Sequence, residues 1–243
     1  MFTKNIKFKN FVGKKNPKLK KILINIIKDK ALLHKYPLLR SLTNEFNYSY
    51  NKKNIHSFKS YSRVNLVGMG GSIIGAQAIY NFLKHKIKKN FSFYNNLQFE
   101  NILKNNEKNI NLIVSKSGNT LETIFNFNLL LQKQKKNKNI ILCEKKNNFL
   151  TLIGKKLKAE IFEHKNYIGG RYSVLSETGM LPAELMGLNE KKFKRFNYLI
   201  NNNYFINNLI ENVISIISHI RQGKTNLVII NYDEKSNNLF KWY

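Results

Sequence analysis

Cysteine, acidic residues and long apolar runs are scarce in this chain. One cysteine, Cys143, in 243 residues cannot form a disulfide within the chain, which excludes a disulfide-stapled secreted domain and favours a reducing, cytoplasmic location. The apolar runs are far shorter than the ~20 residues of a membrane helix. The basic segment Met1–Lys15 is not followed by the apolar stretch of a signal peptide. The five histidines show no metal-ligand spacing. We therefore expect no membrane contact and no bound metal.

The shortage of acidic residues leaves a large positive charge. There are 42 Lys and Arg against 14 Asp and Glu, a net charge of +28, which ordinarily suggests a nucleic-acid partner. However, 37 of the basic residues are lysines, spread along the chain with many asparagines and isoleucines. A/T-rich codons encode all three residue types, whereas a nucleic-acid surface would favour clustered arginine. We expect no specific nucleic-acid partner.

The order of apolar runs indicates an α/β fold. With 42% hydrophobic residues the chain is globular. Between residues 62 and 164, strand-like and helix-like segments alternate, which predicts a parallel sheet flanked by helices. The expected strands are Val64–Val67, Phe91–Tyr94, Ile110–Val114, Ile140–Cys143 and Glu160–Phe162. The expected helices are Ile73–Leu83, Leu121–Gln132 and Phe149–Lys156.

The hexapeptide Ser115–Thr120, sequence SKSGNT, joins an expected strand to an expected helix. It offers three hydroxyls, a glycine and a lysine beside a helix N-terminus, where unpaired N–H groups and partial positive charge favour phosphate. Asn119 and Glu122 also fit a capping box for that helix. Taken alone, the segment is equally consistent with a capped helix after a polar loop.

Two glycine-rich turns favour a phosphate site over a simple capped helix. Gly68–Ser72, sequence GMGGS, follows a strand, and Gly169–Ser173, sequence GGRYS, precedes an expected helix over Val174–Met186. Such turns let backbone N–H groups approach an anion closely. Nucleotide motifs fit poorly, because a dinucleotide fingerprint needs glycine in place of Ile73 and a triphosphate loop needs Lys-Ser/Thr in place of Ala76-Gln77.

The three turns in this order resemble those of glucose-6-phosphate isomerase (phosphoglucose isomerase). About 43 residues separate Ser72 from Ser115, and about 55 separate Ser115 from Gly170. The first two turns alone indicate only the sugar-isomerase (SIS) fold, whereas GGRYS before a helix is typical of this family. The resemblance runs from Val64 to the last residue.

We expect the chain to divide into three parts. Residues 1–60 are expected to form a helical packing arm, with a helix over Pro17–Ile27, where apolar residues recur at helical spacing. Residues 61–190 form a first SIS, phosphosugar-binding, domain. Residues 191–243 hold connecting helices over Lys191–Arg221 and the start of a second SIS domain, with a strand at Asn226–Ile230 and a helix from Asn237.

The resemblance also implies the chemistry, which is interconversion of glucose 6-phosphate and fructose 6-phosphate through a cis-enediolate, in glycolysis and gluconeogenesis and without a cofactor. Arg171 matches the catalytic guanidinium that stabilises the enediolate, although a surface salt bridge is its alternative role. The positions that match substrate and phosphate contacts are Gly71, Ser72, Ser115, Lys116, Ser117, Thr120 and Gly170. The Ser117-Gly118-Asn119 sequence departs from the animal version and leaves mannose 6-phosphate open as a second substrate of a bifunctional enzyme.

The family's catalytic glutamate and histidine match no residue of this chain. We therefore expect an N-terminal fragment that is inactive alone and a homodimer when complete, since the family's histidine comes from a partner subunit. Glu177 and Glu184 are expected to be solvated or salt-bridged, and His164 to be an ordinary strand-end residue. The alternative function is a noncatalytic phosphosugar-binding protein that uses the same phosphate clamp.

Overall fold

The computed structural model describes residues 16–242 except 30, 59, 98–108, 135–136, 196–198 and 200. The expectations for Met1–Lys15 and for parts of the Lys191–Arg221 region lie outside these residues. By spatial contact the chain divides into two compact units. The first holds residues 1–39 and 194–230, and the second holds residues 40–193 and 231–243.

The second unit is built on a five-stranded sheet that is parallel throughout, in the order β2-β1-β3-β4-β5. The strands are β1 (Arg63–Gly68), β2 (Asn90–Tyr94), β3 (Ile110–Val114), β4 (Lys138–Cys143) and β5 (Glu160–Glu163). The predicted strands of this sheet are thus confirmed. The three central strands are buried along almost their whole length, as expected of a sheet covered on both faces.

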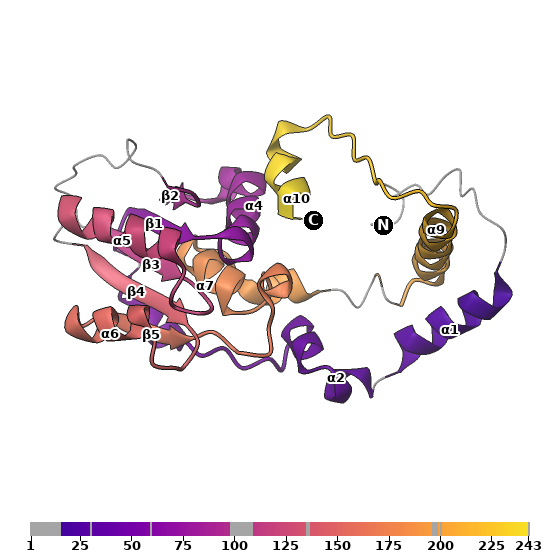
Figure 1. Ribbon diagram of the computed structural model, residues 1–243, viewed down its shortest axis with the longest axis horizontal. Helices are drawn as coiled ribbons and strands as arrows, with labels where there is room; N and C mark the ends of the chain where they lie inside the picture. The colour runs from indigo at the N-terminus through magenta and orange to yellow at the C-terminus, as the bar shows by residue number, and fades with distance from the viewer. Residues whose placement is uncertain are drawn as a thin grey trace. The chain divides into compact units, whose positions relative to one another are not determined.

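Helices cover both faces of this sheet (Figure 1). Its α-helices are α3 (Lys52–His56), α4 (Ile74–Phe82), α5 (Leu121–Lys133), α6 (Phe149–Lys156), α7 (Glu177–Leu185) and α10 (Asn237–Trp242). On one face, Leu66 and Leu112 pack with side chains of α4 and α7. On the other face, Val67 and Ile113 pack with side chains of α5 and α6. Neighbouring strand residues therefore point alternately into two separate apolar cores, one on each face of the sheet. The predicted α/β fold with helices on both faces is confirmed.

A row of buried asparagines crosses the three central strands. Asn65, Asn111 and Asn139 are paired across β1, β3 and β4. Asn65 Nδ2 donates to Asn111 Oδ1 at 2.9 Å, and Asn111 Nδ2 donates to Asn139 Oδ1 at 2.9 Å. Gln134 and Asn137 complete the network, since the carboxamide of Gln134 accepts from both Asn65 and Asn137. Buried amides of this kind are tolerated because they bond to one another.

Helix α7 begins three residues later than predicted. The expected helix over Val174–Met186 is observed as Glu177–Leu185, with Ser176 as its N-cap. Before it, Gly170–Tyr172 forms a 3₁₀ turn, and Ser176 Oγ donates to Ser173 O at 2.7 Å. These turn hydrogen bonds hold the backbone between Ser173 and Ser176 out of the helix.

The regular secondary structure described in the first unit is helical. It contains α1 (Pro17–Lys28), α2 (Leu32–Lys35) and α9 (Asn203–Arg221). Helices α1 and α9 contact each other, and Lys20 Nζ lies 2.7 Å from Glu211 Oε1. Within the predicted helical region Lys191–Arg221, the structure describes a 3₁₀ turn over Glu190–Lys194 and α9 over Asn203–Arg221.

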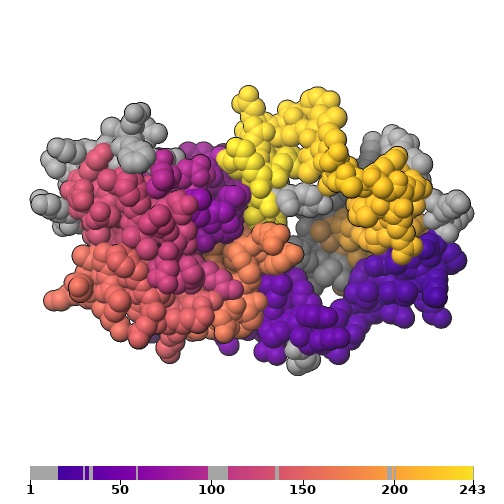
Figure 2. All heavy atoms as spheres, in the orientation of Figure 1, coloured from indigo at the N-terminus to yellow at the C-terminus, as the bar shows by residue number. Residues whose placement is uncertain are grey.

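The predicted strand at Asn226–Ile230 is wrong. Residues 224–233 have no regular secondary structure. Val228 is 79% exposed and Ile230 is 70% exposed, and Figure 2 shows this segment, in yellow, at the surface. A β-strand needs a neighbour to satisfy its backbone N–H and C=O groups. No strand of the described residues pairs with this segment, so its β-branched sequence alone does not make it a strand.

Candidate active site

Two of the three predicted turns lie side by side, at the carboxyl ends of the neighbouring strands β1 and β3, where the order of strands in the sheet reverses. From β1 the chain moves outward to β2, whereas β3, β4 and β5 follow on the opposite side of β1. Turns that leave such a pair of strands in opposite directions open a crevice at their carboxyl ends, where ligands of α/β proteins bind. GMGGS leaves β1 and SKSGNT leaves β3, and Gly68 is paired with Val114.

The SKSGNT turn gathers its three hydroxyl groups. Ser115 Oγ lies 2.9 Å from Thr120 Oγ1, and Ser117 Oγ lies 3.5 Å from the same atom. The N–H of Gly118 donates to Ser115 Oγ at 3.2 Å. Thr120 is the N-cap of α5 and makes no side-chain cap bond, so it leaves the first N–H groups of α5 uncapped. Hydroxyls and N–H groups therefore converge at one helix N-terminus.

The predicted capping box of Asn119 and Glu122 is wrong. Thr120, not Asn119, is the N-cap, and Asn119 Oδ1 accepts a hydrogen bond from the N–H of Phe149 at 2.9 Å, at the start of α6. Gly118 O accepts from the N–H of Leu150 at 3.1 Å. The turn is thus fastened to α6. Gly118 has φ +69, and a Cβ there would lie 2.1 Å from Asn148 Oδ1, so only glycine fits.

The Lys116 side chain bonds to groups outside the SKSGNT turn. Its Nζ donates to Asn166 O at 2.7 Å and lies 3.8 Å from Glu144 Oε1. Its carbonyl accepts from the N–H of Glu144 at 2.9 Å. Lys116 therefore connects the SKSGNT turn to the loop that leads into GGRYS.

The third turn touches the first through backbone atoms. A Cβ built on Gly71 would lie 2.2 Å from Gly170 O and 2.9 Å from Arg171 N, which leaves room for glycine only. Ser173 Oγ donates to Gly170 O at 2.7 Å and lies 3.3 Å from Gly71 O. Two segments about a hundred residues apart in sequence thereby form one surface at the carboxyl end of β1.

Arg171 is exposed at this surface. In the part of the chain that the structure describes, its guanidinium pairs with no carboxylate, so the surface salt bridge weighed as its alternative role is not formed. An arginine without a carboxylate partner keeps its full charge for an anionic ligand.

The family model for phosphoglucose isomerase matches residues 22–230. The chain belongs to the phosphoglucose isomerase family. A glucose-6-phosphate isomerase of Methanocaldococcus jannaschii is 32% identical over 219 residues, which cover 81% of this chain and 52% of the relative. A probable glucose-6-phosphate isomerase of Methanococcus maripaludis is 27% identical and covers 91% of this chain and 54% of the relative. The chain thus spans about half the length of these curated relatives.

Among solved structures, a hypothetical protein of Thermus thermophilus superposes with a TM-score of 0.61 at 18% sequence identity. The match covers 94% of this chain and 55% of that chain. At this level of identity the likeness concerns the fold alone, a parallel sheet with helices on both faces.

The two glutamates after GGRYS have different environments. Glu177 is fully buried, its Oε1 accepts from the N–H of Ser49 at 3.0 Å, and burial raises its pKa. The expectation that Glu177 is solvated or salt-bridged is therefore wrong. Glu184 is salt-bridged as expected, with its Oε1 3.4 Å from Lys52 Nζ. Sequence reasoning missed the burial of Glu177, because Ser49, whose N–H bonds to its carboxylate, lies more than a hundred residues away in the sequence.

His164 follows β5 directly, as expected, and its side chain is buried. Burial lowers the pKa of its imidazole, and the neighbouring Lys165 carbonyl lies 3.0 Å from Nδ1. This histidine is therefore a neutral part of the packing at the end of the strand.

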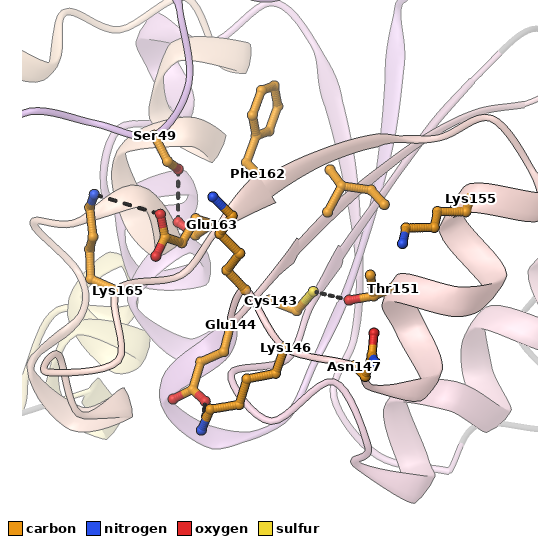
Figure 3. A pocket seen from close by; sticks show the side chains of 12 residues that line it. Ser49, Cys143, Glu144, Lys146, Asn147, Thr151, Lys155, Phe162, Glu163 and Lys165 are labelled. Carbon is orange, nitrogen blue, oxygen red and sulfur yellow. Dashed lines mark hydrogen bonds and ion pairs between the residues drawn. The ribbon is translucent and has the colours of Figure 1, made fainter.

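A cavity of about 760 Å³ lies at the carboxyl ends of β4 and β5 (Figure 3). Its lining residues are Ser49, Cys143, Glu144, Lys145, Lys146, Asn147, Thr151, Lys155, Ile161, Phe162, Glu163 and Lys165. None of the predicted site residues is among them. Sequence reasoning missed this cavity, because its four lysines resemble the many other lysines of the chain.

The described residues include no helix long and apolar enough to cross a membrane. Within the same ranges, no three His, Cys, Asp or Glu side chains come together as ligands of one metal ion would.

Proposed function

We propose that the surface formed by the three turns binds a sugar phosphate and serves the interconversion of glucose 6-phosphate and fructose 6-phosphate. The convergence of GMGGS, SKSGNT and GGRYS at the switch point of the sheet is the observation that carries this proposal. Membership of the phosphoglucose isomerase family and relatives named glucose-6-phosphate isomerase support it.

In this proposal the phosphate binds at the SKSGNT turn. Ser115, Ser117 and Thr120 offer hydroxyls that now bond to one another, and the α5 N-terminus adds N–H groups and partial positive charge. Each hydrogen bond to a phosphate oxygen contributes roughly 1.5–3 kcal/mol. Lys116 adds positive potential beside the clamp, although its ammonium also holds the Asn166 carbonyl.

The sugar then lies over the joined GMGGS and GGRYS turns. Gly71 and Ser72 approach the sugar or its phosphate, and Gly170 and Arg171 face the reacting carbons. When a base moves a proton between C2 and C1, negative charge develops on the enediolate oxygen. A positioned cation and N–H group stabilise that charge more in the transition state than in the ground state. Arg171, which pairs with no carboxylate among the described residues, suits this role.

The base itself is not among the residues that these turns bring together. Glu144, the carboxylate nearest to Lys116, is hydrogen-bonded by Lys146, which lowers its pKa, and this makes it a weak base. Glu177 is buried and bonded to the Ser49 N–H. We therefore propose that residues 1–243 alone isomerise the sugar phosphate only slowly. General base catalysis typically raises the rate of such a reaction roughly 10²–10⁴-fold.

The binding test is calorimetric titration with glucose 6-phosphate and with glucose. We expect a clear preference for the phosphorylated sugar, and we expect Ser115→Ala/Thr120→Ala to remove that preference. Equal affinity for the two sugars would refute the phosphate clamp. Circular dichroism of the double variant separates loss of binding from loss of fold.

The activity test compares residues 1–243 with a protein extended to the length of the relatives, by the rate of fructose 6-phosphate conversion. Comparable rates would place the base within residues 1–243, with Glu177 and Glu184 the first candidates. An extended protein that binds the phosphosugar without converting it would favour a noncatalytic phosphosugar-binding protein. Parallel assays with mannose 6-phosphate test bifunctional activity. The cytoplasmic location and the homodimer stay predictions.

A further inference from the structure

The SKSGNT turn is held in place by the segment Glu144–Leu150, which joins β4 to α6 and is called the anchor segment below. Three of its backbone N–H groups donate to the turn, those of Glu144 to Lys116 O at 2.9 Å, of Phe149 to Asn119 Oδ1 at 2.9 Å and of Leu150 to Gly118 O at 3.1 Å. The turn carries the three hydroxyl groups of the proposed phosphate clamp. The shape of the anchor segment therefore determines where those hydroxyls lie.

Asn148 fixes the shape of the anchor segment. Its side chain is buried, with 5% exposed. Its Nδ2 donates to Glu144 O at 3.2 Å and to Lys146 O at 3.3 Å. Its Oδ1 caps α6, because it accepts from the N–H of Thr151 at 2.9 Å and from Thr151 Oγ1 at 3.0 Å. A primary amide has two N–H donors and two acceptor positions, so this side chain uses its full capacity to tie the loop to the first turn of α6.

Asn148 also touches the SKSGNT turn. Its carboxamide lies against Gly118, where an added Cβ would be 2.1 Å from Oδ1 and 2.2 Å from Cγ of Asn148. Its hydrogen bonds go to the anchor segment and α6 rather than to the hydroxyls of the turn. We infer that Asn148 is a positioning residue of the phosphosugar site, which aligns the clamp hydroxyls through the turn without a bond of its own to the phosphate. This inference rests on the proposed function of the turn.

The experiment measures the affinity of the 243-residue chain for glucose 6-phosphate by calorimetry. Asn148→Asp keeps the oxygen that caps α6, but it replaces the two N–H donors by an oxygen that faces the carbonyls of Glu144 and Lys146. We expect this variant to bind about tenfold more weakly, because misaligned hydrogen bonds weaken steeply and the loss of about one bond to phosphate is a tenfold change. In the extended protein, KM for fructose 6-phosphate should rise by a similar factor with kcat nearly unchanged, because the phosphate is held equally in the ground and transition states.

Three further variants separate positioning from charge and from stability. Asn147→Asp adds the same charge at the neighbouring, exposed side chain, and we expect it to change affinity less than about twofold. Asn148→Ala adds no charge and must reproduce the weaker binding. Ile153→Ala removes packing between α6 and the sheet outside the anchor segment. We expect it to lower the melting temperature measured by circular dichroism and to leave the affinity unchanged.

Three results with a parent that binds glucose 6-phosphate would overturn this inference alone. Equal weakening by Asn147→Asp and Asn148→Asp would assign the effect to charge. Equal weakening by Ile153→Ala and Asn148→Ala would assign it to the stability of α6. Parent-like affinity in both Asn148 variants would show that the anchor segment does not align the clamp. A parent that does not bind glucose 6-phosphate would refute the proposed function of the turn, and this inference with it.

Discussion

Replacing Gly71 by alanine would push apart the two turns that meet at the carboxyl end of β1. The added Cβ would lie 2.2 Å from Gly170 O and 2.3 Å from Gly170 C. Both are backbone atoms, so no side-chain rotation relieves the clash, and the turns must separate by about 1 Å to reach ordinary contact distance. Forced separations of this kind cost about 1–3 kcal/mol.

For Gly71→Ala we expect the upper part of that range, about 2–3 kcal/mol, because the contact is backbone against backbone. In a chain of this size this corresponds to a fall of roughly 4–12 °C in melting temperature. Because Arg171 follows Gly170 directly, the same displacement should lower turnover of the extended protein by about 10²-fold. Circular dichroism melting and the fructose 6-phosphate assay measure the two effects.

Gly169→Ala provides the matched control. Gly169 has φ −72 and ψ 148, which any residue adopts, and the nearest atom to its added Cβ is Tyr172 Cδ2 at 3.7 Å. We expect its melting temperature and turnover to stay close to those of the parent. If Gly71→Ala and Gly169→Ala behave alike, the contact between the two turns does not matter and the reasoning fails.

Three further predictions concern the charge and polar groups of the sheet unit. Arg171→Lys should lower turnover of the extended protein about 10²–10³-fold with a smaller change in KM, because lysine keeps the charge but loses the planar fork; unchanged turnover would make Arg171 structural. Asn111→Ala should cost about 3 kcal/mol in urea unfolding, since buried amides lose their partner, and the exposed Asn90→Ala should cost under about 0.5 kcal/mol; equal costs would argue against the asparagine row. Burial, a side-chain hydrogen bond with Glu190 and the negative charge of Glu190 raise the pKa of Glu184 from 4.5 to about 7. Folding therefore favours its protonated form, and stability should fall by roughly 2 kcal/mol as the pH rises from 5 to 8. Glu184→Gln should remove this fall, and a fall that persists in the variant would assign it to another group.

The central strands could be predicted from sequence because each is buried on both faces. Ile140–Cys143 is a continuous apolar run, and Ile110–Val114 is apolar except for Asn111. Both are found in strands with the predicted bounds or within two residues of them. The GMGGS turn is found directly after β1, as predicted, whereas three residues separate GGRYS from the start of α7. Local pattern suffices where a segment's own composition decides its burial.

The wrong predictions from sequence concern residues whose structure depends on a partner far away in the chain. Asn119 is of a residue type and at a position typical of a helix N-cap, but its side-chain oxygen accepts a hydrogen bond from the N–H of Phe149 instead. Asn226–Ile230 has the composition of a strand and finds no pairing neighbour among the described residues. Glu177 has the sequence of a surface helix residue, yet Ser49 bonds to it in the interior. The contact of Gly71 with Gly170 is of the same kind, because neither segment alone indicates the other.

The buried asparagine row fixes the register between β1 and β3, which the alternation of apolar side chains alone does not determine. Sliding β3 by two residues along β1 would keep every apolar side chain on its own face, since strand side chains alternate with a period of two. It would, however, move Asn111 out of line with Asn65 and leave buried amides unpaired. Such a slip would shift the SKSGNT turn by roughly 6–7 Å relative to GMGGS. The buried amides therefore set the distance between the SKSGNT turn, where we propose that phosphate binds, and the GMGGS turn, whose glycines we propose to face the sugar.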